Sequence, residues 1–144
     1  MTEDLLPVGT QLGRYTIEGL LGQGGMAAVY KVRHDQLNTL QALKMLTVPG
    51  RNIRKRLVQE GRVQAALRHP NIVSVVDIIE HEHQPGLVME YVDGPTLEQL
   101  LQARELAWYE VDHLARGILR GVKAAHNEGL IHRDLKPANV LIAV

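Results

Sequence analysis

The sequence predicts an α+β fold, in which a five-stranded antiparallel sheet with one main helix is followed by a segment made of helices. Short runs of alternating apolar residues fill the first 92 positions, and one helical stretch interrupts them. After the break at Asp93-Gly94-Pro95, apolar residues recur at helical spacing instead. Of the 144 residues, 45% are hydrophobic, which is enough for a core.

The first three strands are expected after a short leader at 1–13. Alternation from Tyr15 through Ile17 to Leu21 predicts the first, and the others are expected at about 27–34 and 39–46, with a turn at 35–38. A glycine-rich turn at 22–25 joins the first two strands, so the arrangement is a hairpin rather than the strand-to-helix step of a dinucleotide-binding fold. Glycines let the backbone approach an anion. Alone, however, this pattern is weak, and an ordinary hairpin turn explains it better.

Two charged residues fall on apolar faces. Lys44 shares a strand face with Ala42 and Leu46, and Glu60 follows Leu57 on the apolar stripe of a helix expected at 51–68. Charge on a buried face is costly unless it is paired, so the two side chains are expected to form an ion pair. A solvated lysine at a sheet edge is the alternative explanation.

The same helix begins with a basic cluster, Arg51, Arg54, Lys55 and Arg56, where positive charge opposes the helix dipole. A solvated face explains it most simply, and binding of a phosphorylated segment is the alternative. Further along, two histidines in 81–84 suggest a metal pair. With no third ligand nearby, a solvated hairpin tip is favoured.

The remaining elements follow in order. A fourth strand is expected from Ile72 to about Ile79 and a fifth at 87–92. Helices are expected at 96–103 and from Trp108 to about Asn127, the second with a long apolar stripe. A further strand is expected to begin at 141–144.

The stretch 131–140 carries the groups with the clearest chemistry. Within six positions it holds a carboxylate, Asp134, an amine, Lys136, and a carboxamide, Asn139. A carboxylate can accept a hydroxyl proton, an amine can neutralise phosphate, and an amide oxygen can bind Mg²⁺. These are parts for phosphoryl transfer, where positioning and charge neutralisation supply most of the catalysis. Turn formation is the simpler use of Asp and Asn beside a proline.

This stretch resembles the catalytic loop of Hanks-type protein kinases in its H-R-D-L-K-P-x-N form, with Lys136 typical of the serine/threonine branch. The glycine turn resembles the family's phosphate-covering loop, although Ala27 replaces the third glycine. Its Gly-Gly-Met-Ala run is most similar to that of bacterial members. Ala42-Leu43-Lys44 resembles the strand with the phosphate-binding lysine, and Glu60 follows at the family's spacing of sixteen residues.

The resemblance implies a protein-kinase-like fold that transfers the γ-phosphoryl group of ATP to Ser or Thr of a protein substrate, with Mg²⁺ as the metal. It implies Asp134 as the base, Lys136 at the γ-phosphate, Asn139 as a metal ligand, and Lys44 paired with Glu60 at the α- and β-phosphates. Glu90 and Val92 would bond the adenine edge. The implied nucleotide-binding residues are Leu21, Gly22, Gln23, Gly24, Gly25, Met26, Ala27, Ala28, Val29, Ala42, Lys44, Glu60, Met89, Glu90, Val92 and Leu141.

The domain organisation expected from this resemblance is a kinase N-lobe with hinge at 14–92 and the start of the C-lobe at 93–144. No D-F-G motif follows Asn139, and the sequence has no Phe. We therefore expect a fragment with negligible turnover by itself, and a catalytically inactive nucleotide-binding or interaction module is the alternative function.

Composition and net charge limit the binding partners and the cellular location that we expect. Net charge is zero, which gives no electrostatic reason to expect nucleic acid as a partner. No apolar run approaches the roughly 18 residues of a membrane span, and no signal peptide is visible behind the acidic N-terminus. The absence of cysteine fits a reducing cytoplasm. The oligomeric state stays open.

Overall fold

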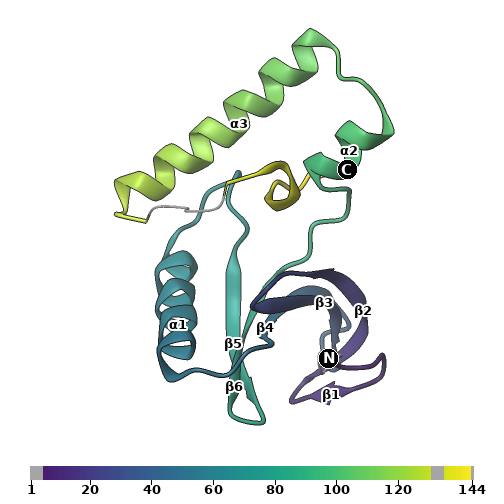
Figure 1. Cartoon of the computed structure of the whole chain (residues 1–144), viewed down its shortest axis with the longest axis vertical. Helices are drawn as coiled ribbons and strands as arrows, with labels where there is room; N and C mark the ends of the chain where they lie inside the picture. Colours follow the sequence, from purple (N-terminus) through teal and green to yellow (C-terminus); the bar gives the residue numbers. More distant parts are fainter. Residues whose placement is uncertain (1–4, 131–134, 144) are drawn as a thin grey trace. The chain divides into compact units, whose positions relative to one another are not determined.

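The structure is a computed structural model that describes residues 5–130 and 135–143. The described residues form two compact units, one drawn from the ranges 5–66 and 74–91 and the other from 67–73, 92–130 and 135–143. The first unit holds the sheet and one helix, and the second holds the remaining helices (Figure 1). Each unit is described by itself below.

The first unit contains an antiparallel sheet of six strands in the order β1-β2-β3-β4-β6-β5. Five strands were predicted and are confirmed, and the sixth is the two-residue β1 within the expected leader, too short to show a period. The helix α1 was expected to continue to Arg68 and ends two residues earlier. The elements are β1 (Gln11–Leu12), β2 (Tyr15–Gln23), β3 (Ala27–His34), β4 (Leu40–Leu46), α1 (Arg51–Ala66), β5 (Val75–His81) and β6 (Gln84–Glu90).

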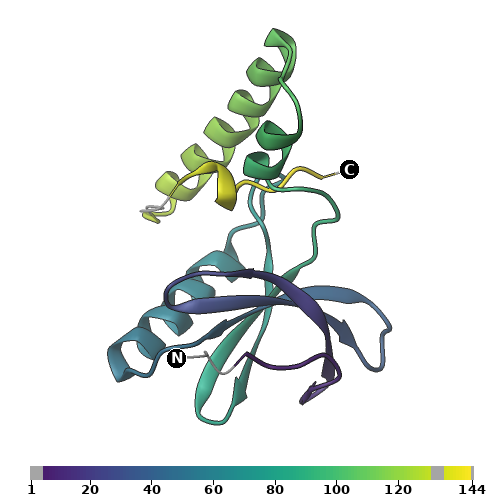
Figure 2. The ribbon, with the colours of Figure 1, turned by 45° about the vertical axis from the view of Figure 1, so that its right-hand side comes forward.

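The sheet is curled, so that strands from its two sides meet (Figure 2). Tyr15 on β2 and Asp77 on β5 are separated by three strands in the sheet order, yet the Tyr15 hydroxyl donates to Asp77 Oδ2 at 3.0 Å. Burial first, and then the Asp77 carboxylate, raise the pKa of Tyr15 to about 12, so the phenol stays protonated. The Tyr15 ring also lies edge-on to buried His34, with 5.2 Å between ring centroids.

Apolar side chains fill both faces of the sheet. The larger cluster lies on one face and includes Tyr30, Val32, Leu43 and Val88, which are almost fully buried. A smaller cluster on the other face joins the sheet to α1 through Leu57. Gly61 of α1 permits this approach, because a Cβ there would lie 2.5 Å from Cδ2 of Leu87.

The face alternation predicted for the first strand is wrong beyond Ile17. Pairing between β2 and β3 shifts between Ile17 and Gly19 and again between Leu20 and Gly22, so Glu18 and Leu21 are the extra residues of two bulges. Each extra residue interrupts the two-residue period. Leu21 therefore does not share the buried face of Tyr15 and Ile17, and it is 47% exposed.

The second unit contains α2 (Leu97–Ala103), α3 (Trp108–Asn127) and a short 3₁₀ turn, η1 (Pro137–Asn139). Thr96 caps α2: its hydroxyl accepts from the Gln99 N–H, and the Gln99 side chain accepts from the Thr96 N–H. The bounds of α3 agree with the prediction. In place of the strand expected at 141–144, the described part shows one bridge between Leu141 and Thr96.

Side-chain pairs hold the N-terminal end of α3. Arg104 donates to both oxygens of Glu110, with Nη2 to Oε2 at 2.6 Å, and the Ala107 N–H donates to Oε1 at 2.9 Å. The Arg104 bonds first, and then the Ala107 bond, lower the pKa of Glu110 to about 2. A negative charge here also complements the helix dipole. Within the described residues, no helix has the length and apolar character needed to cross a bilayer.

Candidate functional site: a sheet face and a glycine turn

Four of the predicted nucleotide-binding residues lie on one face of the sheet. The register pairs Val29 with Lys44 and Ala42 with Met89 across neighbouring strands. Directly paired residues point to the same side, and Ala42 and Lys44 are two positions apart on β4. Lys44 is therefore a half-buried ammonium group among apolar neighbours, as predicted from the strand pattern.

Ala28 lies on the other face. It is fully buried in the larger core cluster beside Tyr30, because neighbouring residues of a strand point to opposite sides. Its side chain is thus part of the core. Any contact that Ala28 makes with a ligand on the Lys44 face would have to come from its backbone.

The glycine turn joins β2 to β3 and is open. The Gly24 N–H donates to the Ala27 carbonyl at 2.8 Å, and the Thr47 N–H donates to the Met26 carbonyl at 2.9 Å. Gly22, Gly24 and Gly25 are outside the left-handed region. A Cβ at Gly22 or Gly25 would meet nothing within 4 Å, and one at Gly24 only the Ala27 oxygen at 3.8 Å.

Neither the backbone angles nor the packing of this chain therefore requires glycine at these three positions. A ligand that approaches the turn closely gives a physical reason for them, since a Cβ would project into the space that such a ligand needs. The turn fits the polyphosphate of a nucleotide in this respect. Met26 at its tip is 52% exposed.

The expected ion pair between Lys44 and Glu60 is not formed. Within the described residues the ion pairs are Arg33–Glu18, Arg104–Glu110 and Arg116–Asp112. Glu60 is exposed, whereas Leu57 and Gly61 are the buried residues of α1. A step of three residues leaves Glu60 about 60° around the helix from Leu57, so it flanks the buried stripe rather than lying on it. The expectation that Glu60 faces the sheet is thus wrong for this structure.

The end of β6 carries the residues predicted to meet adenine. The Glu90 N–H donates to the Ser74 carbonyl at 2.9 Å, and the Ser74 N–H donates to the Glu90 carboxylate at 2.9 Å. With its N–H used in this way, the Glu90 backbone has only its carbonyl to offer a ligand. Met89 packs against the cluster that includes Leu57 of α1.

The sequence reasoning did not single out a contact close to this strand end. Lys31 Nζ lies 5.2 Å from the ring centroid of Tyr91, within the range of a cation–π interaction. Lys31 pairs with Ala42, so it lies on the same sheet face as Lys44. Lys31 lies two residues after Val29 on the same strand, and this spacing is the feature of the sequence that could have predicted its position on the Lys44 face.

The second unit carries the described part of the predicted catalytic loop. Lys136 and Asn139 are exposed, and the Asn139 N–H donates to the Lys136 carbonyl at 2.9 Å. The segment is held at its end, where the Leu97 N–H donates to the Val140 carbonyl at 2.8 Å. Leu141 is 42% exposed. The predicted base, Asp134, lies outside the described residues.

An amide oxygen such as that of Asn139 is a suitable ligand for Mg²⁺. In the part of the chain that the structure describes, no cluster of three or more His, Cys, Asp or Glu side chains could hold a metal ion. Asn139 is a candidate Mg²⁺ ligand only because of the chemistry of its amide oxygen. The roles predicted for Val92, Lys136, Asn139 and Leu141 stay predictions.

A curled antiparallel sheet with one packed helix, a glycine turn and a lysine on the adjacent strand define a protein kinase domain. Residues 15–144 match the protein kinase domain family, and the chain belongs to that family. Its relatives include bacterial serine/threonine kinases. The catalytic-loop motif predicted the serine/threonine branch, and the glycine turn predicted the likeness to bacterial members.

Serine/threonine-protein kinase PknJ of Mycobacterium tuberculosis is 36% identical over 141 residues, which cover 96% of this chain and 24% of that protein. The probable serine/threonine-protein kinase PknB of Lactococcus lactis is 42% identical over 135 residues, covering 90% and 22%. The crystal structure of the Mycobacterium tuberculosis PknI kinase domain superposes with a TM-score of 0.83 at 34% identity, covering 96% of this chain and 58% of that one. The chain thus spans about a quarter of the length of these curated relatives.

Proposed function

We propose that the protein transfers the γ-phosphoryl group of ATP to serine or threonine hydroxyls of a protein substrate. The observation that carries the proposal is the sheet face on which Lys44 lies among Val29, Ala42 and Met89, with Val29 on the strand that follows an open glycine turn. An apolar surface suits a purine ring, and a lysine with exposed backbone N–H groups suits its phosphates. Membership of the protein kinase family supports the same chemistry.

The proposed roles follow from the chemistry of each group. Lys44 neutralises the α- and β-phosphates, and the glycine turn offers N–H groups to the polyphosphate. The Glu90 carbonyl and the Val92 backbone meet the adenine edge. Asp134 accepts the hydroxyl proton and orients the nucleophile, while Lys136 stabilises the charge that develops on the transferred group. Asn139 binds Mg²⁺, which neutralises phosphate charge when it is bound.

A second candidate function is nucleotide binding without turnover. It is favoured by the exposed Glu60, because protein kinases need the strand lysine and helix glutamate paired for catalysis. In the arrangement described, Lys44 has no carboxylate to hold it against the phosphates. Pairing would require α1 to rotate or shift so that the Glu60 side chain faces β4.

Thermal unfolding in the presence of ATP and Mg²⁺ tests the nucleotide site. Ligand at about 50 times its Kd stabilises the native state by roughly 2.3 kcal/mol, a shift of several degrees for a chain of this size. We expect this shift in the wild type and its loss in Lys44→Met. Lys123→Met, which removes an exposed lysine from α3, is the matched control and should retain the shift. Equal shifts in the Lys44 and Lys123 variants would refute the proposed site.

Phosphate incorporation into a generic basic protein separates the two functions. Because no D-F-G motif follows Asn139, we expect negligible incorporation by residues 1–144, with the ATP-dependent thermal shift intact. Incorporation that disappears in Asp134→Asn while the shift remains would overturn that expectation and support phosphoryl transfer by this chain.

A further inference from the structure

The end of β6 is held by contacts on both of its sides, all within the first unit. On the side of β5, the Ser74 carbonyl accepts from the Glu90 N–H and the Ser74 N–H donates to the Glu90 carboxylate, each at 2.9 Å. On the side of β4 and β3, the Lys31 ammonium group lies 5.2 Å from the ring centroid of Tyr91. Glu90 is exposed and Tyr91 is half-buried, so these contacts rather than burial in the core order the two residues.

The sheet register brings Lys31 to Tyr91. Lys31 pairs with Ala42 on β4, and Ala42 pairs with Met89 on β6, so the three residues form a row on the Lys44 face. Tyr91 lies two residues after Met89, directly beyond the last residue of β6. The lysine stem and the tyrosine ring together span the two strand spacings between β3 and β6, about 10 Å in all.

The ammonium group of Lys31 is available to this ring. Among the residues that the structure describes, no ion pair includes Lys31. The Glu18 carboxylate lies within electrostatic reach of Lys31, but Arg33 Nε donates to it at 2.6 Å and is the main cause of the lowered pKa of Glu18. The Tyr91 ring therefore receives the ammonium group without a competing direct bond to a carboxylate.

These contacts act on the Glu90 carbonyl, the group proposed to meet the adenine edge. That carbonyl belongs to the planar peptide unit that joins Glu90 to Tyr91, so the backbone at these two residues sets its direction. The Ser74 bonds order the Glu90 side of the unit, and the Lys31 contact orders the Tyr91 side. A carbonyl ordered from both sides loses little further freedom when a ligand binds, which favours binding.

We propose that Lys31 is a positioning residue of the nucleotide site, which holds Tyr91 by a cation–π contact and so directs the Glu90 carbonyl at the amino group of adenine. This inference rests on the proposed nucleotide binding, and it concerns a residue outside the motifs by which the chain resembles protein kinases. Lys31 lies two residues farther than Val29 from the glycine turn, about 7 Å along β3. Its role therefore differs from that of Lys44, which acts on the phosphates.

Two nucleotides that differ only at the base edge test the proposal with the full chain of 144 residues. Affinities come from displacement of N-methylanthraniloyl-ATP, followed by its fluorescence in the presence of Mg²⁺. ATP carries an amino donor at position 6 of the purine, whereas inosine triphosphate carries a carbonyl acceptor there. We expect Lys31→Met to weaken ATP binding by about two- to fivefold, as for a cation–π contact at a partly exposed site, and inosine triphosphate binding by less than about 1.5-fold. Equal loss for both nucleotides would mean an action on the phosphates and would overturn the proposal.

Variants of the two partners test whether Lys31 acts through Tyr91. Lys31→Arg keeps a cation beside the ring and should retain ATP affinity within about twofold of the wild type. Tyr91→Leu should weaken ATP binding as much as Lys31→Met does, and the double variant should lose no more than either single variant, because one contact is removed in all three. Additive losses in the double variant would overturn the proposal, as would a loss in Lys31→Arg equal to that in Lys31→Met.

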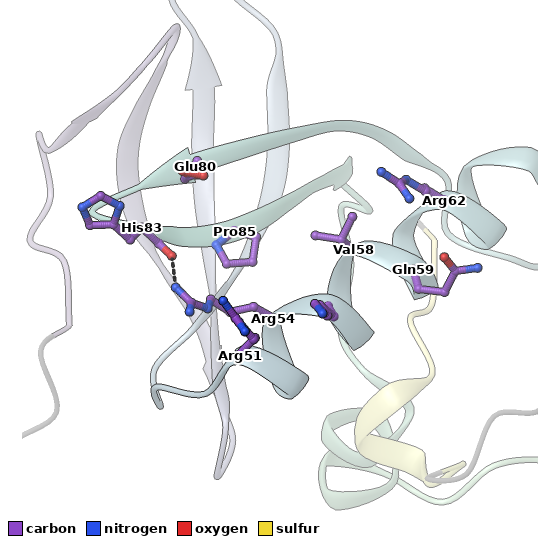
Figure 3. A pocket seen from close by; sticks show the side chains of 9 residues that line it. Arg51, Arg54, Val58, Gln59, Arg62, Glu80, His83 and Pro85 are labelled. Atoms are coloured by element: carbon purple, nitrogen blue, oxygen red, sulfur yellow. Dashed lines mark hydrogen bonds between the residues drawn. The ribbon is translucent and has the colours of Figure 1, made fainter.

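Lys55→Met is the matched control. Lys55 is an exposed residue of α1 and lines an open groove of about 560 Å³ between this helix and the β5–β6 hairpin, which includes neither Lys31 nor Tyr91 (Figure 3). The substitution removes the same charge and should change ATP affinity by less than about 1.5-fold. Equal losses in the Lys55 and Lys31 variants would mean general attraction by positive charge and would overturn the proposal. Absence of ATP binding by the wild type would overturn the proposed function as well, whereas unchanged ATP affinity in Lys31→Met would overturn the positioning role alone.

Discussion

Alanine substitutions at two glycines one turn apart in α3 should have opposite effects on the stability of the protein. A Cβ at Gly121 would lie 2.8 Å from the backbone oxygen of Asn71, and backbone cannot move aside cheaply. A Cβ at Gly117 would lie 3.1 Å from Nδ2 of Asn71, the free end of a side chain. Alanine gains about 1 kcal/mol over glycine in a helix interior, whereas overpacking costs roughly 1–3 kcal/mol. Gly121→Ala should therefore destabilise the protein by up to about 2 kcal/mol, and Gly117→Ala should stabilise it by up to about 1 kcal/mol.

Urea unfolding followed by circular dichroism at 222 nm measures the difference. With equal slopes, the midpoint should fall for Gly121→Ala and rise for Gly117→Ala relative to the wild type. Stabilisation of similar size in both variants would refute the reasoning, because it would mean that helix propensity alone decides and that α3 does not approach Asn71 this closely. The contrast matters for function, since α3 leads into the predicted catalytic loop.

Three further predictions rest on single features. Gly25→Ala should stabilise the fold by about 0.4–1 kcal/mol, because the site is open and φ is ordinary, yet reduce the ATP-dependent thermal shift. Carboxyl NMR titration should give Glu110 a pKa of about 2, and Arg104→Ala should move it up towards 4.5. Because this pKa is depressed by folding, the contribution of Glu110 to stability is complete above about pH 4.5 and is lost as the pH falls towards 2. Replacing Glu82 and His83 by Asn and Gly should raise the free energy of unfolding by about 1 kcal/mol or more, since neither present residue suits positive φ, and an unchanged urea midpoint would contradict this.

Local signals predicted much of the fold. The bounds of α3 followed from its helical apolar stripe, the bounds of β3 agree with the prediction, and the turn at 35–38 lies where Asn38 adopts positive φ. The two-residue β1 escaped prediction because it depends on pairing with β2 rather than on a pattern of its own. The sheet face predicted for Leu21 was wrong because the bulges depend on pairing with the partner strand.

The sequence also predicted part of the candidate site, namely the part that depends only on local patterns. The placement of Lys44 with Val29 needs only the period of two and the hairpin register, which the sequence indicates. The orientation of Glu60 depends on how α1 rests on the sheet, and there Gly61 rather than Glu60 faces Leu87. The basic cluster at 51–56 was visible in the sequence. Its combination with Arg62 and the β5–β6 turn into a groove required the tertiary structure.

The bridge between Thr96 and Leu141 has a consequence for how the chain is made. Thr96 leaves the ribosome about 45 residues before its partner, which at roughly 5–20 residues per second is a delay of several seconds. Helices α2 and α3 are local and can form within that interval. The segment with Lys136 and Asn139 can be positioned only after Leu141 has emerged. The residues predicted to take part in catalysis are therefore placed on helices that have already formed.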